Sequence, residues 1–258
     1  PDFAVNMLEN IKHIFEVEGV QFVLVTNFDQ LKASINHCYG NGLDAQRYLD
    51  KFVQFSLSLA DTHKPNGPEA VLASITHLRK LLVNSDLLDN AGFADPHEGV
   101  RVFLEALVAT NRLSLREVET LVRYLEIYQT LTGKEGLSTG KVFGYRLLRA
   151  FGVFLYCFKP SVAESMVRGT PEITQLTALF GKTELFRDWE HSRPNYPDLV
   201  IAMIAYELKD CGEAFACSED ERSHWEEIFS ACFQGGFFGP DRYSQVVVGA
   251  IETMKLAG

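Results

Sequence analysis

A seven-residue apolar run near the amino terminus is the feature that most constrains the fold of this chain. Residues 20–26 read VQFVLVT, follow a glycine and precede Asn27. A continuous run of this kind, rich in β-branched side chains, is typical of a strand buried on both faces, as in a parallel sheet. Helices are predicted on both sides, over residues 3–16 and from about residue 29 to 39. Because a lone parallel strand has no hydrogen-bonding partner, we expect its neighbours to come from residues upstream of Pro1 or from another chain.

The first of these helices begins almost at the first residue. The chain has no initiator Met, so the sequence looks as though it begins within a longer protein. No N-terminal signal peptide is predicted. Apolar side chains at helical spacing define one face of the predicted helix: Phe3, Met7, Leu8, Ile11, Ile14 and Phe15.

A second segment with strand character leads into the clearest linker of the chain. Apolar side chains alternate with polar ones and predict a strand with one buried face: Val53, Phe55, Leu57 and Leu59. Residues 61–68 (DTHKPNGP) are dense in turn-forming residues and predict a linker. We therefore expect residues 1–60 to hold an α/β layer and residues 68–258 to form an almost wholly helical region. The predicted fold class is mainly α, with a remnant of a parallel sheet.

The region after the linker carries the start signals of helices. Asp95-Pro96 and Thr170-Pro171 are two predicted helix starts, with a capping residue followed by a proline. About seven or eight helices are expected in this region. Three serines are each followed three positions later by a glutamate, which is the capping-box pattern: Ser114 with Glu117, Ser161 with Glu164, and Ser218 with Glu221.

Composition narrows the functional classes. The apolar fraction of 47% and the charged fraction of 22% are those of an ordinary globular protein. The net charge of −10 argues against broad binding of nucleic acid through its phosphates. The five cysteines form no CxxC pair, which indicates reduced thiols in a cytoplasmic protein. No Cys/His cluster predicts a metal site.

Residues 142–158 are the best candidate for a membrane span, and two charges argue against it. Arg146 and Arg149 lie in the middle of the segment. Two guanidinium groups at the centre of a bilayer are too costly. The segment is therefore interpreted as a buried amphipathic helix, and no membrane partner is expected.

An ordered series of short motifs in the first sixty residues resembles one protein family. Residues 22–31 (FVLVTNFDQL) are followed by HCYG at 37–40, YLDKF at 48–52 and an F-x-L-x-L pattern at 55–59. This series resembles the KAP family of P-loop NTPases, and residues 1–5 look like the segment that follows the acidic Walker B strand. The likeness covers roughly residues 1–60 well and residues 113–124 more loosely.

The resemblance implies an ATPase with a parallel-sheet core and a helical lid. Residues 1–60 would be the C-terminal part of the P-loop core, and residues 68–258 the helical lid and a further helical region. Many bacterial members look associated with defence against phage, but the resemblance alone does not assign that role to this chain. The implied cofactors are ATP and Mg²⁺ in the intact protein.

The sequence lacks the loop that ATP hydrolysis on this fold requires. That loop is GxxxxGK followed by Ser or Thr, and it works with an acid near Mg²⁺. Residues 136–142 (GLSTGKV) are the candidate, but three residues separate the glycines and Val142 replaces the hydroxyl. They are interpreted as an ordinary loop. We therefore expect the ligands of ATP and Mg²⁺ to lie mostly outside this chain, in a missing N-terminal portion, and this chain alone not to hydrolyse ATP.

Two residues are candidates for what remains of the site. Asn27 ends the predicted strand, where ligands of open α/β sheets bind, and the resemblance implies that it senses the γ-phosphate. It could equally just end the strand and start a turn. Arg116, in the first turn of a predicted helix, resembles the second-sensor arginine of helical lids, or is a solvated surface residue. Asp29 is expected to cap the helix that follows Asn27, and Lys51 to be a surface charge rather than a phosphate contact.

A different functional class stays open beside the ATPase. The chain could be a non-catalytic helical module that docks other proteins, such as an effector or a second copy of itself. The run at residues 229–239 (FSACFQGGFFG) could present an apolar patch for such a partner or lie in the core. A third alternative is a regulatory lid that gates the site of another subunit.

Overall fold

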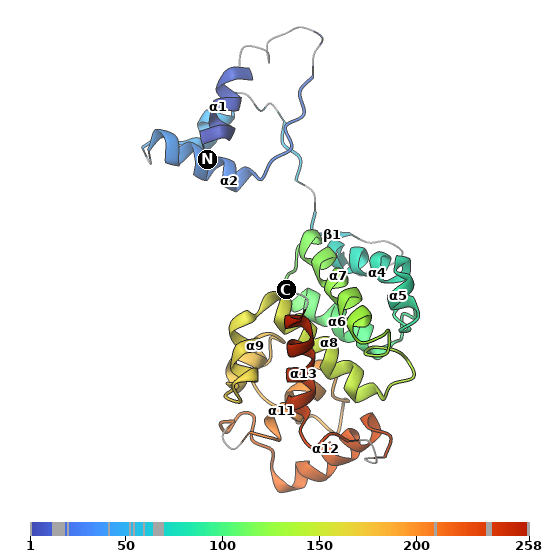
Figure 1. Cartoon of the computed structure of the whole chain (residues 1–258). Helices are drawn as coiled ribbons and strands as arrows, with labels where there is room; N and C mark the ends of the chain where they lie inside the picture. The colour runs from blue at the N-terminus through green and yellow to red at the C-terminus, as the bar shows by residue number, and fades with distance from the viewer. Residues whose placement is uncertain are drawn as a thin grey trace. The chain divides into compact units, whose positions relative to one another are not determined.

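The chain is mainly helical, as predicted, and divides into two compact units. The amino-terminal unit is Pro1–Ala60 and the carboxy-terminal unit is Asp61–Gly258, each with its own hydrophobic core (Figure 1). The computed structural model describes residues 2–11, 19, 21–40, 42–51, 53, 55–58, 60–63, 70–208, 211–235 and 239–256.

Three helices build the amino-terminal unit: α1 (Asp2–Ile11), α2 (Phe28–Tyr39) and α3 (Ala45–Leu49). The expected helices over residues 3–16 and 29–39 are thus present within the described residues. Glu9 on α1 accepts hydrogen bonds from the hydroxyl of Tyr39 on α2, at 3.2 Å, and from that of Tyr48 on α3. Six buried side chains form its core: Val5, Leu8, Leu31, Ile35, Ala45 and Leu49.

The expected apolar face of the first helix is only partly right. Leu8 is buried, but Phe3 is 81% exposed and Met7 is also exposed. Val5 is buried instead. Among the described residues, the core of this unit takes Val5 and Leu8 from α1 and leaves Phe3 and Met7 outside it. Ile14 and Phe15 of the expected face lie outside the described residues.

The two expected strands are absent from the described residues. Residues 21–27 form no strand, and Val23 and Val25 are 87% and 93% exposed. In the second segment, residues 53, 55–58 and 60 form no strand, and Phe55 and Leu57 are 78% and 79% exposed. The physical reason is that a strand needs a neighbouring ladder, and the described residues of this unit offer none. The burial expected for these segments is wrong for this structure, and the parallel sheet stays a prediction.

The carboxy-terminal unit is helical except for one short hairpin. Strand β1 (Thr62–His63) pairs antiparallel with β2 (Val71–Leu72), with Thr62 opposite Leu72. Strand β1 lies within the expected linker, and residues 64–68 of that linker are outside the described residues. The helices that follow are α4 (Ala73–Asn84), α5 (Asp86–Asp89), α6 (Gly99–Thr110), α7 (Leu115–Leu131), α8 (Phe143–Phe158), α9 (Pro160–Val167), α10 (Ile173–Ala178), α11 (Tyr196–Ala205), α12 (Glu219–Cys232) and α13 (Tyr243–Lys255).

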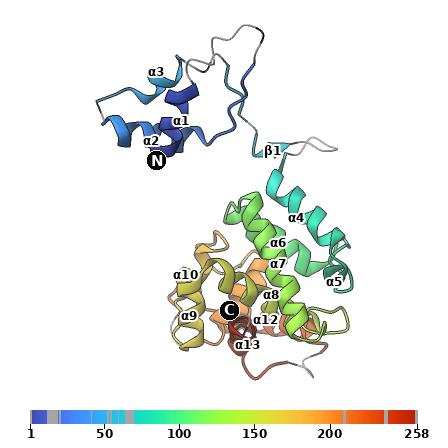
Figure 2. The same ribbon diagram turned by 45° about the horizontal axis from the view of Figure 1, so that its top comes forward.

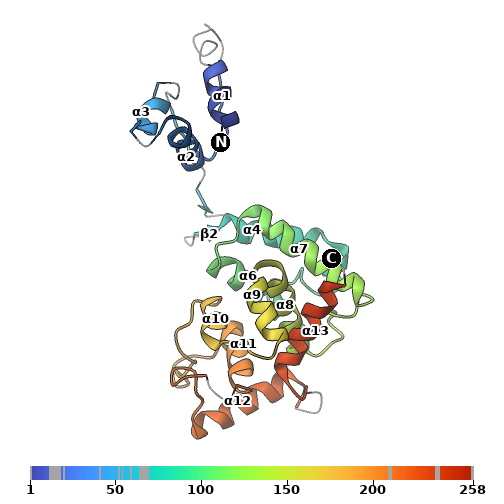
Figure 3. The ribbon, with the colours of Figure 1, turned by 60° about the vertical axis from the view of Figure 1, so that its left-hand side comes forward.

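Helix α8 is the centre of this unit. Helix α13 packs along α8 and also contacts α9 (Figures 1 and 2), and α4 runs beside α7 (Figure 3). The approach of α13 is close because α8 has Gly152 at the crossing. A Cβ atom there would lie 2.7 Å from the Cβ of Ala250 and 2.7 Å from the carbonyl oxygen of Val247. The absence of a side chain at this position is therefore what allows α13 to lie against α8.

The sequence predicts only some of the starts of these helices correctly. The capping boxes of α7, at Ser114 and Glu117, and of α12, at Ser218 and Glu221, are both formed. Ser161 caps nothing, because α9 begins one residue earlier, at Pro160. The expected starts at Asp95-Pro96 and Thr170-Pro171 are wrong, since α6 begins after Glu98 and α10 after Glu172. A further capping box, unrecognised in the sequence, opens α11 at Asn195 and Asp198.

A buried arginine holds the loops of this unit against its central helix. The segment expected to be a buried helix, residues 142–158, contains α8 (Phe143–Phe158), whose Arg146 is 5% exposed and pairs with Glu98 at 2.9 Å between Nη1 and Oε1. Its Nε donates to the carbonyl of Leu137 at 2.9 Å and its Nη2 to that of Ala91 at 2.7 Å. Among the described residues, no helix is long and apolar enough to cross a membrane.

Replacing Arg146 by Met is expected to lower the free energy of unfolding by about 3–5 kcal/mol, because the carboxylate of Glu98 is left buried without its counter-charge. The matched control is Arg168→Met, whose ion pair with Glu164 is 68% and 59% exposed. The control should cost less than about 1 kcal/mol. Urea unfolding followed by circular dichroism measures both values, and equal losses would contradict a structural role for the Arg146 pair.

The five cysteines are free thiols, as expected, and they differ in burial. Cys38 is exposed, whereas burial raises the pKa of Cys157 to about 12 and that of Cys232 to about 11. Alkylation requires the thiolate, which a raised pKa makes scarcer at a given pH.

At pH 8 and without denaturant, iodoacetamide is expected to label Cys38 first. Cys157 and Cys232 should react only after unfolding, because burial both blocks access and keeps their thiols protonated. Peptide mass spectrometry over a time course checks this order. Labelling of Cys157 as fast as that of Cys38 would show that α8 is not packed as described.

Candidate functional site

Asn27 is the residue that starts α2. Its side-chain Oδ1 accepts hydrogen bonds from the backbone amides of Asp29 and Gln30, both at 3.1 Å. Asn27 is therefore the N-cap of α2, and the expectation that Asp29 plays this role is wrong. The alternative interpretation gave Asn27 a local structural role. Its Oδ1 has such a role, because it caps α2.

The side-chain Nδ2 of Asn27 carries hydrogens that the helix cap does not use. The residue is exposed, and within the described residues its Nδ2 donates no hydrogen bond. Because the cap fixes Oδ1 towards the helix, the orientation of the amide group is set and Nδ2 is held as a donor. A donor beside the first amides of a twelve-residue helix lies where the helix dipole favours negative charge. This arrangement fits a phosphate oxygen and leaves the sensing role of Asn27 a prediction.

The segment before Asn27 exposes apolar side chains. Phe22 is 43% exposed, and Val23 and Val25 are almost fully so. Leu24 alone is half-buried and packs against the core of the amino-terminal unit. The segment therefore connects the capping asparagine to an apolar surface that this unit leaves open.

Arg116 lies in the first turn of α7, as expected. The capping box of Ser114 and Glu117 fixes the start of this helix, and bonds from Ser114 lower the pKa of Glu117. The Arg116 side chain is exposed, and its guanidinium makes no ion pair or hydrogen bond within the described residues. Its cation is thus available to an anion. Asn27 belongs to one unit and Arg116 to the other, and their joint role in one site stays a prediction.

Residues 136–142 form a loop that is held by its own contacts. The amide of Gly136 donates to Oγ1 of Thr132 at 3.0 Å, and that of Leu137 to Oε1 of Gln129 at 2.7 Å. Nζ of Lys141 pairs with Glu135 at 2.8 Å. Two of its amides and its lysine are therefore already engaged, which fits the interpretation of these residues as a structural loop.

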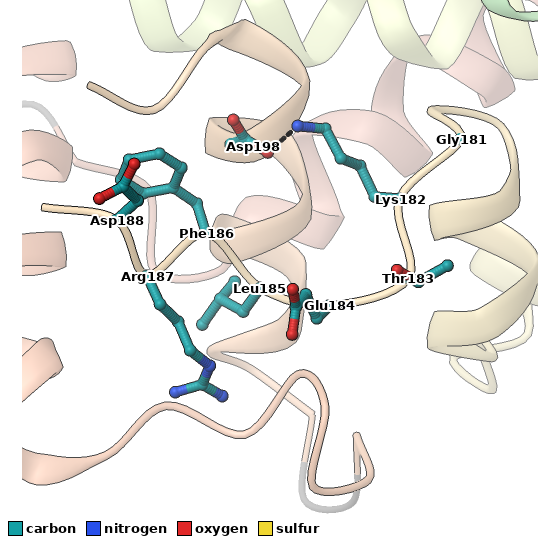
Figure 4. Close-up of a pocket in the computed structure, with 9 residues that line it drawn as sticks. All are labelled: Gly181, Lys182, Thr183, Glu184, Leu185, Phe186, Arg187, Asp188 and Asp198. Carbon is teal, nitrogen blue, oxygen red and sulfur yellow. Dashed lines mark ion pairs between the residues drawn. The ribbon is translucent and has the colours of Figure 1, made fainter. Parts of the chain in front are cut away.

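A pocket of about 520 Å³ lies elsewhere in the carboxy-terminal unit, beside the residues that connect α10 to α11 (Figure 4). Lys182 points from the connecting segment to Asp198 on α11, with 2.7 Å between Nζ and Oδ1. Asp198 is 3% exposed and also accepts from the amide of Asn195. On the other side, Arg187 binds both carboxylate oxygens of Glu221, at 2.6 and 2.8 Å.

This pocket contains a Gly-Lys-Thr sequence, at residues 181–183, that our sequence analysis did not consider. Its geometry is not that of a phosphate loop, because it follows helix α10 rather than a strand and does not start a helix. The amide of Lys182 donates to the carbonyl of Thr177 at 3.1 Å, and the lysine charge is neutralised by Asp198. The two cations of the pocket are thus used to hold α11 and α12 in place.

The sequence also predicts that Lys51 is a surface charge and that no metal site is formed. Lys51 is exposed, with its Nζ 6.0 Å from the centre of the Tyr48 ring, which fits a surface residue. Across the described ranges, no group of three or more His, Cys, Asp or Glu side chains is arranged to hold a metal ion. Binding of ATP or Mg²⁺ by this chain stays a prediction.

Comparison with known proteins assigns the family. No curated protein and no solved structure matches the chain significantly. A family model, described as the KAP family P-loop domain, matches residues 1–132. The match includes Asn27, Arg116 and all of α7, and it covers more than half of the 258 residues. The chain therefore belongs to the KAP family of P-loop NTPases.

Proposed function

We propose that this chain supplies the phosphate-sensing segment and the helical lid of a KAP-type ATPase. In this proposal ATP and Mg²⁺ bind chiefly to a glycine-rich loop and an acid that other residues provide. The amino-terminal unit is the last part of the P-loop core, and the carboxy-terminal unit is the lid with a further helical region. The observation that carries the proposal is the family match over residues 1–132, which includes both candidate phosphate contacts.

The proposed role of Asn27 follows from how its amide group is fixed. Oδ1 is held by two backbone amides, so Nδ2 cannot rotate away without losing the helix cap. A donor held in advance stabilises the charge that develops on a transferring phosphate, without reorganisation during the reaction. Asn27 would thus donate from Nδ2 to a γ-phosphate oxygen or to the attacking water.

The proposed role of Arg116 rests on its charge and its position. Its guanidinium is exposed and unpaired within the described residues, at the start of a helix that the Ser114 capping box fixes. A planar guanidinium binds two phosphate oxygens at once. A cation in the first turn is unfavourable with the helix dipole, and a bound phosphate would offset that cost. Arg116 would therefore contact the phosphates in the ground state as well as in the transition state.

The exposed apolar segments support the position of this unit in a larger sheet. Val23 and Val25 in the first segment, and Phe55 and Leu57 in the second, lie almost fully in solvent. Exposed apolar side chains of this density mark a contact surface. We propose that both segments become strands when the rest of the P-loop core is present. Asn27 would then lie at the end of a strand, where nucleotides bind in open α/β sheets.

The same exposed segments also support the alternative class, a non-catalytic helical module. An apolar surface in the amino-terminal unit would then bind an effector protein or a second copy of the chain. The two functions differ in one measurable respect, because only the ATPase requires Asn27 and Arg116 to affect nucleotide turnover. Cytoplasmic location stays a prediction from the cysteine pattern, and a role in phage defence stays a proposal that the family resemblance alone does not assign.

The sharpest test compares Asn27→Ala with Asn27→Asp in the full-length protein that contains this chain and a phosphate loop. Aspartate keeps the helix cap, since it is an equally good N-cap, but it removes the Nδ2 donor. Both variants are expected to lower kcat by about 10²–10³-fold. Asn27→Ala should leave the affinity for ATP little changed, whereas the carboxylate of Asn27→Asp should also weaken ATP binding because it repels the γ-phosphate. If Asn27→Asp keeps normal turnover and only Asn27→Ala loses it, Asn27 is a capping residue alone.

Arg116→Ala is expected to weaken ATP binding and to lower kcat together, because the guanidinium contacts the phosphates in both states. The matched control is Arg123→Ala, an exposed arginine two turns further along the same helix. Steady-state phosphate release and binding of a fluorescent ATP analogue measure the two effects. Equal kinetics for the Arg116 and Arg123 variants would exclude Arg116 from the site.

A further inference from the structure

A small pocket between α11, α12 and the start of α13 has an aromatic lining with one acid. Its volume is about 340 Å³. Besides its rings, the lining contains Gly239, Pro240, the hydroxyl of Ser230 and the carboxylate of Glu226, and the lining residues that the structure describes include no cation. The side chains that the argument uses are Tyr206, Glu226, Phe229, Phe233 and Tyr243.

The rings of this pocket are fixed by contact with one another. Phe229 and Phe233 are 3% and 1% exposed, whereas Tyr206 and Tyr243 are partly exposed. The ring of Tyr243 lies 5.4 Å from that of Phe229 and 5.5 Å from that of Phe233. Ring faces carry negative potential, so rings held in place form a surface that attracts a cation.

The carboxylate of Glu226 is exposed and lies at this aromatic surface. Its Oε1 accepts the hydroxyl of Tyr206 at 2.6 Å, a bond that raises the pKa of Tyr206 and keeps its phenol a donor. In the described part of the chain, no ion pair reaches Glu226. Two neighbouring acids differ in this respect, since Glu221 pairs with Arg187 and Glu207 lies 3.9 Å from Arg242. Glu226 therefore has no ion pair of its own among the described residues, and the cation of Arg222 lies one turn before it on α12.

The protein itself shows which cation suits these rings. The guanidinium of Arg222, one turn before Glu226, lies over the ring of Tyr206, with its Cζ 5.4 Å from the ring centre. A guanidinium stacks on an aromatic face and pairs with a carboxylate at the same time, which a lysine ammonium does less well. Around the pocket, α12 exposes further acids at Glu219, Asp220 and Glu227.

We propose that this pocket binds the guanidinium group of an arginine side chain that a partner protein presents. The pocket holds the end of one side chain rather than a large ligand, and the acidic surface of α12 complements a basic partner segment. The guanidinium would lie against the ring of Tyr243, because Arg222 already lies over the ring of Tyr206, and it would donate to Oε2 of Glu226. This site is independent of the proposed nucleotide site.

The test is an NMR titration of the whole chain with the peptide acetyl-Gly-Arg-Gly-amide. Saturable shifts are expected at residues 206, 226 and 243. The same peptide with citrulline, the neutral isostere of arginine, should not bind. Glu226→Gln should weaken binding by about tenfold or more, because it removes one partner of a charge-assisted hydrogen bond. The matched control is Glu227→Gln, an exposed acid on the same helix that does not line the pocket.

Three results would overturn the proposal. Equal shifts with the arginine and citrulline peptides would show that charge is not recognised. Equal weakening by the Glu226 and Glu227 variants would show only general attraction to an acidic helix. N-ethylguanidinium that binds as tightly as the peptide would exclude a partner protein and leave a site for a small cation.

Discussion

The carboxy-terminal unit depends on the ion pair between Arg146 and Glu98 more than on any other single interaction. Glu98 serves two elements, because its second oxygen accepts from the amide of Arg101 at the start of α6. The guanidinium of Arg146 also binds the carbonyls of Ala91 and Leu137, which belong to two loops distant in sequence. One buried charge pair therefore fixes α6, α8 and the loop before α8. That loop contains Gly136 and Gly140, which resemble the glycines of a phosphate loop. Its Leu137 carbonyl accepts a hydrogen bond from Arg146.

The amino-terminal unit presents the opposite situation, because its core of six side chains is small and two apolar segments remain outside it. This difference between the two cores underlies the different roles proposed for the two units. In the proposed function the unit with the closed core would be the lid, and the unit with the exposed segments would be a piece of a larger sheet. Asn27 in one unit and Arg116 in the other each offer a donor that is unpaired among the described residues, at the start of a helix.

The sequence predicted helices better than it predicted burial. The positions of α2 and α7, and the caps at Ser114 and Ser218, follow from local hydrogen bonding and were predictable. Residues 20–26 have strand composition, but strand pairing depends on residues distant from the segment, so composition alone did not determine their state. The ion pair of Lys182 was not predictable from the sequence either. Its partner Asp198 lies sixteen positions away, and only the fold brings the two side chains together.

Hydrogen–deuterium exchange of the full-length protein, with and without ATP and Mg²⁺, tests the central claim most directly. The account predicts that the amides of residues 21–27 exchange slowly in both states, because they form a strand in the assembled core. It also predicts that ATP adds protection at residues 27–30 and 114–118, around Asn27 and Arg116. Fast exchange of residues 21–27, together with no effect of ATP at either helix start, would contradict the assignment of this chain to a nucleotide site.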